Sequence, residues 1–322
     1  MTRRVAAVDC GTNSLRLLVA DVDLVRAELT DVARRMEIVR LGQGVDQTGR
    51  LAPEALARTA GVLRDYADVI AATAARSVRM VATSATRDAS NTVEFTRQVK
   101  EILGVAPEVL TGSEEALLSF TGATAELAAA GEEGPFLVAD IGGGSTEFVL
   151  GNALVRGDGP PRAISVNIGC VRMTERHLHG DPPTGAELAV ATTDIDAALD
   201  SVTSAIPVRQ AQTLIGLAGS VTTVAGIAMG LPAYDAARIH HARVCAADVQ
   251  EVTRSLLAQT RAARAAIGVM HPGRVDVIGG GALILDRIMQ RFGFSEVLVS
   301  EHDILDGIAW SLAAYISGDA RY

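Results

Sequence analysis

Two short stretches of the chain combine an acidic residue, glycine and a hydroxyl side chain at the same spacing. The first reads VDCGTNSLR, from Val8 to Arg16, and the second reads ADIGGGSTE, from Ala139 to Glu147. In both, an aspartate ends an apolar run and the pattern Gly-x-x-Ser follows. Glycine permits a tight turn that exposes backbone amides to an anion, and the serine hydroxyl adds a donor. A carboxylate beside such a turn can hold a divalent cation near phosphate oxygens. The repeat therefore predicts two turns that grip a polyphosphate group.

A single glycine turn of this kind is weak evidence, because on its own it is more typical of an ordinary structural hairpin. Two further glycine turns are expected in the second half of the chain, at GLAGS (216–220) and at IGGGA (278–282). Together with the repeat, they favour ligand binding over a purely structural role.

Composition restricts the ligand and its surroundings. The chain has 322 residues, a formal net charge of −9 and 3% aromatic residues. This length favours about two domains. The acidic balance argues against nucleic acid or an anionic membrane as a partner, and the scarcity of aromatics argues against base stacking. Positive charge for an anionic ligand must come from arginine, since Lys100 is the only lysine, and a P-loop is excluded because no Gly-Lys-Ser/Thr occurs.

Other features predict a soluble protein of the cytoplasm. The cysteines Cys10, Cys170 and Cys245 lack metal or redox spacing, so free thiols in a reducing compartment are expected. The N-terminus does not have the pattern of a signal peptide. The uncharged stretch 213–234 is long enough to span a bilayer, but its glycines and Pro232 favour a strand, a turn and a short helix.

The hydrophobic pattern predicts an α/β fold in two halves that begin with the same strand–turn–strand device. The expected elements of the first half are strands at 5–9, 15–21, 36–41 and 78–82, and helices from Pro53, at 93–103, and from a cap at Ser113 to about residue 130. The sequence GEEGP at 131–135 marks a break. The second half is expected to contain strands at 136–140, 147–151 and 163–168, a helix after Gly169 and a final helix at 303–316. We expect one domain at 1–130, completed by a helix at 303–319, and a second at 131–302.

These motifs resemble those of the actin, sugar-kinase and heat-shock-chaperone ATPase superfamily, which has a ribonuclease H-like fold. More narrowly, the chain resembles the exopolyphosphatase and guanosine-pentaphosphate phosphohydrolase family, in its short actinobacterial form. The stretches that carry the resemblance are DCGTNSLRLLVAD, VRLGQGVDQTGRL, VATSATRDASN, LTGSEEALLSFTGA, VADIGGGSTEFVLG, IGCVRMTERHL and IGGGALILD. The resemblance implies two actin-like domains with the active site in a cleft between them.

The resemblance also implies roles for a catalytic pair. Glu115, the second glutamate of SEEA, matches the position that orients and deprotonates the attacking water. Arg87 is the expected guanidinium clamp on the transferred phosphoryl group. The plain alternatives are that Glu114 and Glu115 are solvated acids at a helix start, and that Arg87 forms a surface salt bridge with Asp88.

Metal and phosphate positions follow from the same resemblance. Asp140 and Glu147 match positions that coordinate magnesium, or manganese, or that organise its waters, and a monovalent cation is a further candidate. Asp9 either shares the metal or only caps its turn. The expected phosphate donors are Thr12, Asn13, Ser14, Gly143, Gly144, Ser145 and Thr146.

Additional positive groups have two interpretations each. Arg16 could point toward the substrate or across to a carboxylate. A group within RIHHARV, namely Arg238, His240, His241 and Arg243, forms either a track for a polyanion or an ordinary solvated loop. His177 and His179 lack a third metal ligand and are expected at the surface.

The expected function is that of an exopolyphosphatase, which hydrolyses the terminal phosphate of short-chain inorganic polyphosphate by direct attack of water. The alternative is hydrolysis of guanosine pentaphosphate or another nucleoside polyphosphate. An ATP-dependent kinase and a non-enzymatic nucleotide switch are more distant alternatives, which leave SEEA and ATSATRDASN unexplained. The resemblance implies a homodimer.

Overall fold

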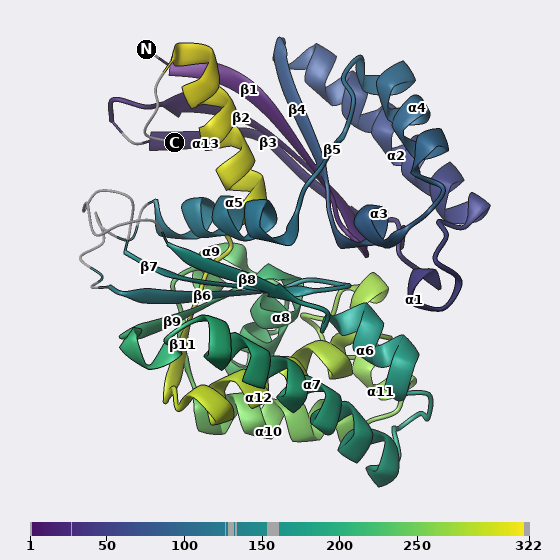
Figure 1. Ribbon diagram of the computed structural model, residues 1–322, viewed down its shortest axis with the longest axis vertical. Coiled ribbons are helices and arrows are strands. Elements are labelled where there is room, and N and C mark those ends of the chain that lie inside the picture. The colour runs from purple at the N-terminus through teal and green to yellow at the C-terminus, as the bar shows by residue number, and fades with distance from the viewer. Residues whose placement is uncertain are drawn as a thin grey trace. The chain divides into compact units, whose positions relative to one another are not determined.

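The computed structural model describes residues 2–26, 28–125, 127, 132, 134–152 and 161–318. The chain forms two compact units. The first contains Met1–Ala130 and Asp303–Tyr322, and the second contains Gly131–His302. Parts of the expected break at 131–135 and residue 319 lie outside the described residues. The helix expected to run to about residue 130 ends at Thr124, so that prediction was wrong. Each unit is built around one mixed β-sheet (Figure 1).

The sheet of the first unit has the order β3-β2-β1-β4-β5. Its strands are β1 (Thr2–Cys10), β2 (Ser14–Asp23), β3 (Glu28–Ile38), β4 (Ser77–Ala82) and β5 (Glu108–Val109). The first three strands form an antiparallel meander, and β4 and β5 run parallel to β1. The parallel pairing places the ends of β1 and β4 at one edge of the sheet, where the first glycine turn begins.

Helices cover both faces of this sheet (Figure 1). They are α1 (Val45–Thr48), α2 (Pro53–Ala72), α3 (Ser84–Asp88), α4 (Thr92–Leu103), α5 (Gly112–Thr124) and α13 (Ile304–Ser317). Alternate residues of β1 enter two different cores. Val8 packs in the core that includes residues of α2 and α4, and Ala7 packs in the core that includes residues of α13. A strand that is buried on both faces reads as a continuous apolar run, as β1 does.

The second unit repeats the same core topology. Its strands are β6 (Phe136–Ile141), β7 (Thr146–Gly151), β8 (Arg162–Val166), β9 (Thr213–Leu217), β10 (Arg243–Cys245) and β11 (Glu296–Val299). The sheet order is β10-β11-β9-β6-β7-β8, with β6, β7 and β8 antiparallel and β6, β9 and β11 parallel. Read from β8, this order matches the first sheet strand for strand, with β10 added at the far edge.

The helical segments of the second unit follow the strands in alternation. They are α6 (Cys170–His177), α7 (Gly185–Ala205), η1 (Val208–Gln210), α8 (Ala218–Ala228), α9 (Ala236–Ile239), α10 (Ala246–Ala258), α11 (Arg261–Ala265), η2 (Pro272–Arg274) and α12 (Ile278–Phe292). One large core joins the sheet to these helices. The uncharged stretch at 213–234 forms β9 and α8, and within the described residues no helix is both long and apolar enough to cross a membrane.

Other local predictions were also wrong. The strand expected at 36–41 is β3, which begins at Glu28 and ends at Ile38, because it pairs with β2 along its whole length. The cap of α5 is Thr111 and not Ser113.

The stretch IGGGA is the first turn of α12 and not a loop turn. Tertiary packing overrides the low helix propensity of glycine there. A Cβ at Gly280 would lie 2.9 Å from the carbonyl oxygen of Cys170, so the helix needs small residues to approach α6.

Candidate active site

The two repeated motifs form equivalent hairpins, one in each unit. Asp9 pairs with Arg16 across β1 and β2, and Asp140 pairs with Glu147 across β6 and β7. Both turns close in the same way: the amide of the first glycine donates to the serine carbonyl at 3.0 Å, from Gly11 in one and from the equivalent glycine in the other. Residues that face each other across a strand pair lie on the same side of the sheet. The chemical difference between the hairpins is therefore the residue that faces each aspartate across the strand pair, Arg16 in the first hairpin and Glu147 in the second.

In the first hairpin, Arg16 lies between two buried carboxylates. Its Nε and Nη2 donate to Asp9 Oδ2 at 2.9 and 2.6 Å, and its Nη1 contacts Asp303 Oδ2. Of the two orientations considered for Arg16, the structure shows the one directed at carboxylates of its own unit. Burial raises the pKa of Asp9, and Arg16 acts against this increase. Asp9 Oδ1 has no hydrogen-bond partner within the described part of the chain.

In the second hairpin, two carboxylates lie side by side. Asp140 and Glu147 are buried, with exposed fractions of 8% and 2%. Ser165 Oγ on β8 donates to Glu147 Oε1 at 2.7 Å, which orients that side chain. A pair of buried carboxylates is costly unless positive charge is supplied. The oxygen atoms of the two carboxylates are hard ligands that suit Mg²⁺. This ion takes few protein ligands and keeps water or phosphate oxygens in its other positions. Among the described residues, no group of three or more His, Cys, Asp or Glu side chains forms a complete metal site.

The carbonyl groups of the first turn are held by the loop after β3. Asn13 O accepts from Val39 N at 3.0 Å, and Thr12 O accepts from Gly42 N at 2.8 Å. In contrast, the amides of Thr12 and Asn13 have no backbone acceptor within the described residues. Amides left open in a fixed turn are suited to bind an anion.

The second turn is held by the start of α6. Cys170 N donates to Gly142 O at 2.9 Å, and Arg172 Nε donates to Gly144 O at 2.6 Å. The amides of Gly143 and Gly144 have no backbone acceptor in the described part of the chain. Arg172 was not anticipated from the sequence, since its role depends on the contact between α6 and the turn.

The hydroxyl groups expected to donate to phosphate differ in their availability. Thr12 Oγ1 is buried and has no hydrogen-bond partner within the described residues, and Ser14 is partly exposed. Ser145 is buried. Thr146 is also buried, and its Oγ1 donates to Ile168 O at 2.5 Å. The proton of the Thr146 hydroxyl is therefore already used inside the unit.

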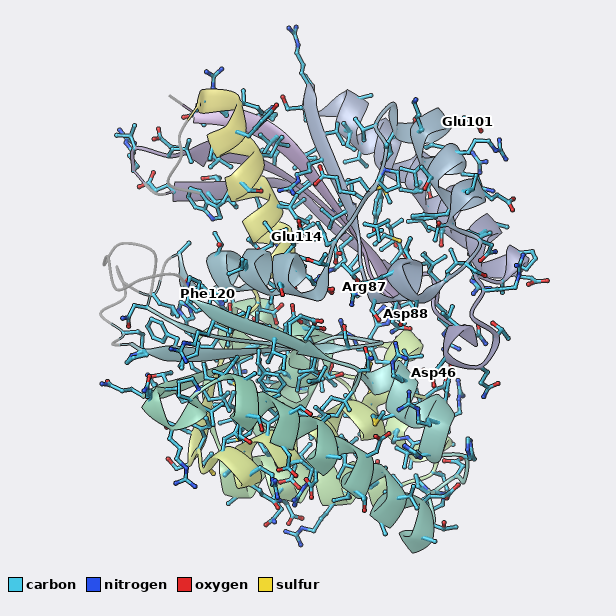
Figure 2. All side chains as sticks on the ribbon, viewed as in Figure 1. Asp46, Arg87, Asp88, Glu101, Glu114 and Phe120 are labelled. Carbon is cyan, nitrogen blue, oxygen red and sulfur yellow. The ribbon has the colours of Figure 1, made fainter. Side chains whose placement is uncertain are left out.

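The two residues expected to be catalytic are brought together in the first unit. Arg87 Nη1, from α3, donates to Glu115 Oε2 at 3.1 Å and to Leu110 O at 2.9 Å. Glu115 is 8% exposed. The structure thus gives Arg87 a carboxylate partner other than Asp88 (Figure 2).

The neighbouring glutamate has a different role. Glu114 Oε2 accepts from the amide and the hydroxyl of Thr111, both at 2.8 Å, and forms a capping box at the start of α5. Figure 2 labels Glu114 at this end of α5. Because consecutive helical residues point about 100° apart, Glu115 then faces α3. The capping box therefore accounts for the exposed Glu114 as part of the helix start, a contact that Glu115 does not make.

An arginine that the sequence motifs did not indicate lies beside α8. A Cβ at Gly219 would lie 2.2 Å from the guanidinium group of Arg274, and Arg274 Nη1 donates to Thr223 Oγ1 at 3.3 Å. Ala218 before them has a φ of 70°, a left-handed conformation that is uncommon for alanine. This helix start follows Leu217, which pairs with Asp140 across β9 and β6. Arg274 therefore adds positive charge to the edge of the sheet that carries the second turn.

The residues expected as a polyanion track differ in their surroundings. The rings of His240 and His241 stack with their centroids 3.8 Å apart, and the ring centroid of His302 lies 4.5 Å from that of His240. Arg243 contacts Glu296 and also binds Glu132 at 2.6 Å. Two carboxylates neutralise this arginine, which favours the alternative of an ordinary solvated loop at this position.

Arg238 is exposed on α9. His177 Nε2 lies 2.8 Å from Asp194 Oδ2, and His179 is exposed. The three cysteines are free thiols, and burial raises the pKa of Cys10 and Cys170, which makes neither a nucleophile.

Comparisons with known proteins agree along nearly the whole chain. Exopolyphosphatase 2 of Mycobacterium tuberculosis is 52% identical over 321 residues, which cover 96% of this chain and 98% of that protein. The crystal structure of an exopolyphosphatase-like protein, 42% identical, has a TM-score of 0.92 and covers 97% of this chain and 99% of its own. The Aquifex aeolicus member of the Ppx/GppA protein family, 28% identical, has a TM-score of 0.80 with 99% of each chain covered. These structures confirm the predicted fold class of two actin-like α/β domains. The sequence pattern of the Ppx/GppA phosphatase family matches residues 18–315, and the chain belongs to this family.

Proposed function

We propose that this protein is an exopolyphosphatase, which hydrolyses the terminal phosphoanhydride bond of inorganic polyphosphate. The observation that carries the proposal is the contact between the buried Glu115, at the start of α5, and the partly exposed Arg87 of α3, which lie 3.1 Å apart. The similarity to Exopolyphosphatase 2 supports the choice of substrate. Phosphoryl transfer to water needs a positioned nucleophile and compensation of negative charge, and little covalent chemistry from the protein.

Glu115 is proposed as the group that orients the attacking water and accepts its proton. Its Oε2 is held by Arg87, which fixes the carboxylate in one orientation. The guanidinium group of Arg87 has five N–H donors, so it can hold Glu115 and still bind a phosphate oxygen. Arg87 is therefore proposed to contact the transferred phosphoryl group.

The two glycine turns are proposed to bind phosphate through the open amides of Thr12, Asn13, Gly143 and Gly144. Asp140 and Glu147 fit Mg²⁺ or Mn²⁺, because both are oxygen ligands on one face of the sheet. A divalent cation held there would compensate the charge on phosphate oxygens. Asp9, in the first unit, is a further candidate cation ligand, because its buried Oδ1 has no hydrogen-bond partner within the described residues.

Replacement of either glutamate of SEEA tests the proposal, because the two side chains have separate roles. Glu115→Gln is expected to lower kcat about 100-fold or more, the usual contribution of a general base. Glu114→Gln is the matched control and should retain kcat within about threefold, because it alters only the helix cap. Phosphate release would be measured with short-chain polyphosphate, long-chain polyphosphate and guanosine pentaphosphate.

Two results would contradict the proposal. Equal losses in both variants would show that Glu115 acts through helix stability. A clear preference for guanosine pentaphosphate would show that the substrate is a nucleoside polyphosphate.

A further inference from the structure

Asp303 lies where several elements of the first unit meet. It is the N-cap of α13, and its Oδ1 accepts from Leu305 N at 3.0 Å. Its other oxygen contacts Arg16 Nη1. Only 4% of the residue is exposed. A cap needs one carboxylate oxygen, so the contact with Arg16 is an additional function of this side chain.

Arg16 connects Asp303 to the aspartate of the first turn. Both donors that reach Asp9 end on the same oxygen, Oδ2. An arginine and a carboxylate more often form a fork, in which two N–H groups bind the two oxygens. To bind Asp9 in a fork, the guanidinium group of Arg16 would have to rotate. The contact of its Nη1 with Asp303 anchors the planar group and opposes this rotation. Asp9 Oδ1 consequently stays without a hydrogen-bond partner within the described residues.

The backbone of Asp303 also borders the helix that carries Glu115. A Cβ at Gly122 of α5 would lie 1.8 Å from the carbonyl oxygen of Asp303. One at Gly307 of α13 would lie 2.0 Å from the carbonyl oxygen of Leu118. The two helices therefore touch through their backbones at this crossing, and Figure 1 shows the start of α13 beside α5. Asp303 thus contacts both Arg16 of the first hairpin and α5, the helix that carries Glu115.

We propose that Asp303 is a positioning residue for the hydrolysis reaction. By anchoring Arg16, it keeps the buried Asp9 Oδ1 without an arginine donor, so that this oxygen can bind a cation or a water molecule. The inference rests on the proposed function, since it assigns Asp303 to the same site. Loss of the Asp303 charge would let Arg16 rotate into a fork that covers both oxygens of Asp9.

The same helix start offers a matched control. Asp306 belongs to the same capping box as Asp303, accepting from its backbone amide at 3.0 Å. Asp306 also pairs with an arginine of the meander, Arg34 Nη2, at 2.5 Å. The other partner of Arg34 is the exposed Asp31, whereas the other partner of Arg16 is Asp9 of the first hairpin. Asp306→Asn therefore removes a comparable cap and ion pair without altering Asp9.

The main test compares Asp303→Asn with Asp306→Asn in the full-length protein. Asparagine is as good an N-cap as aspartate, so Asp303→Asn removes mainly the charge. Partners behind a ligand typically contribute 10–100-fold to metal affinity or activity. We expect Asp303→Asn to lower kcat on short-chain polyphosphate about 10-fold or more, with KM changed less than about threefold. Asp306→Asn should retain kcat within about threefold, even where thermal unfolding shows an equal loss of stability.

Two further measurements separate positioning from general damage. In the Asp9→Asn background, adding Asp303→Asn should lower kcat by less than about a further threefold. The reason is that the effect of Asp303 depends on Asp9. Calorimetric titration with Mn²⁺, without substrate, should show weaker binding for Asp303→Asn than for Asp306→Asn. Asp303→Ser, which also keeps the cap, replaces Asp303→Asn if that variant does not fold.

Equal losses of kcat in the two single variants, or a full additional loss in the Asp9→Asn background, would overturn the proposal. Failure of the proposed function has a different signature, because the unchanged protein would then release no phosphate from any polyphosphate. In that case the Mn²⁺ titration decides the inference: equal affinities in the two variants would refute it.

Discussion

Arg16→Gln is expected to produce a large, pH-dependent loss of stability in the first unit. The change leaves Asp9 and Asp303 without their shared cation, at exposed fractions of 2% and 4%. Removing one partner of a buried ion pair costs about 3–5 kcal/mol. The Arg16 side chain is 20% exposed, so about 3 kcal/mol is expected at pH 7. That is a large part of the roughly 5–15 kcal/mol that stabilises a typical domain.

The pH dependence of this loss follows from the direction of the pKa of Asp9. Burial raises that pKa, and Arg16 opposes the increase, so the variant should have a still higher pKa in the folded state. A carboxyl group with a raised pKa binds more protons when folded than when unfolded. Stability then falls as pH rises from the unfolded pKa through the folded pKa. The deficit of Arg16→Gln should consequently be largest at pH 7 and become smaller toward pH 5.

Urea unfolding at pH 7 and pH 5, with a chelator present, measures this effect. Trp310 is the only tryptophan of the chain and is buried on α13, so its fluorescence reports on the first unit. Arg97→Gln is the control, because its ion pair with Glu101 is exposed and should contribute no resolvable stability. An equal deficit at both pH values, or one no larger than that of Arg97→Gln, would refute the reasoning.

Two further predictions concern the metal and the helix crossing. Glu147→Gln should lower the magnesium-dependent rate about 10–100-fold while the fold is retained, and an unchanged rate would remove Glu147 from the proposed metal site. Gly122→Ala should destabilise the first unit by about 1–3 kcal/mol, because its Cβ would overlap the carbonyl oxygen of Asp303. Gly61→Ala in α2 has open space around its Cβ and should instead stabilise the unit by about 0.5–1 kcal/mol. Equal effects of the two alanines in thermal unfolding would contradict the close crossing.

The sequence by itself was sufficient for the features that depend on neighbouring residues. The doubled pattern of an apolar run, an aspartate and Gly-x-x-Ser correctly indicated two equivalent hairpins, with Asp9 and Asp140 at matching positions. The alternation of strand and helix patterns along the chain and the helix start at Pro53 are local signals of the same kind. Such signals predict an α/β repeat because they depend on residues that are close together in the chain.

Only the tertiary structure decided how the charged side chains are used. The partners of Arg16 and Arg87, Asp303 and Glu115, come from other elements of the first unit. Long side chains can reach several partners, and their choice depends on which carboxylates the packing brings near. Arg274 likewise becomes relevant only because its segment lies against α8. Chain distance carries no information about such contacts, since they arise when remote elements pack and exclude water around buried charges.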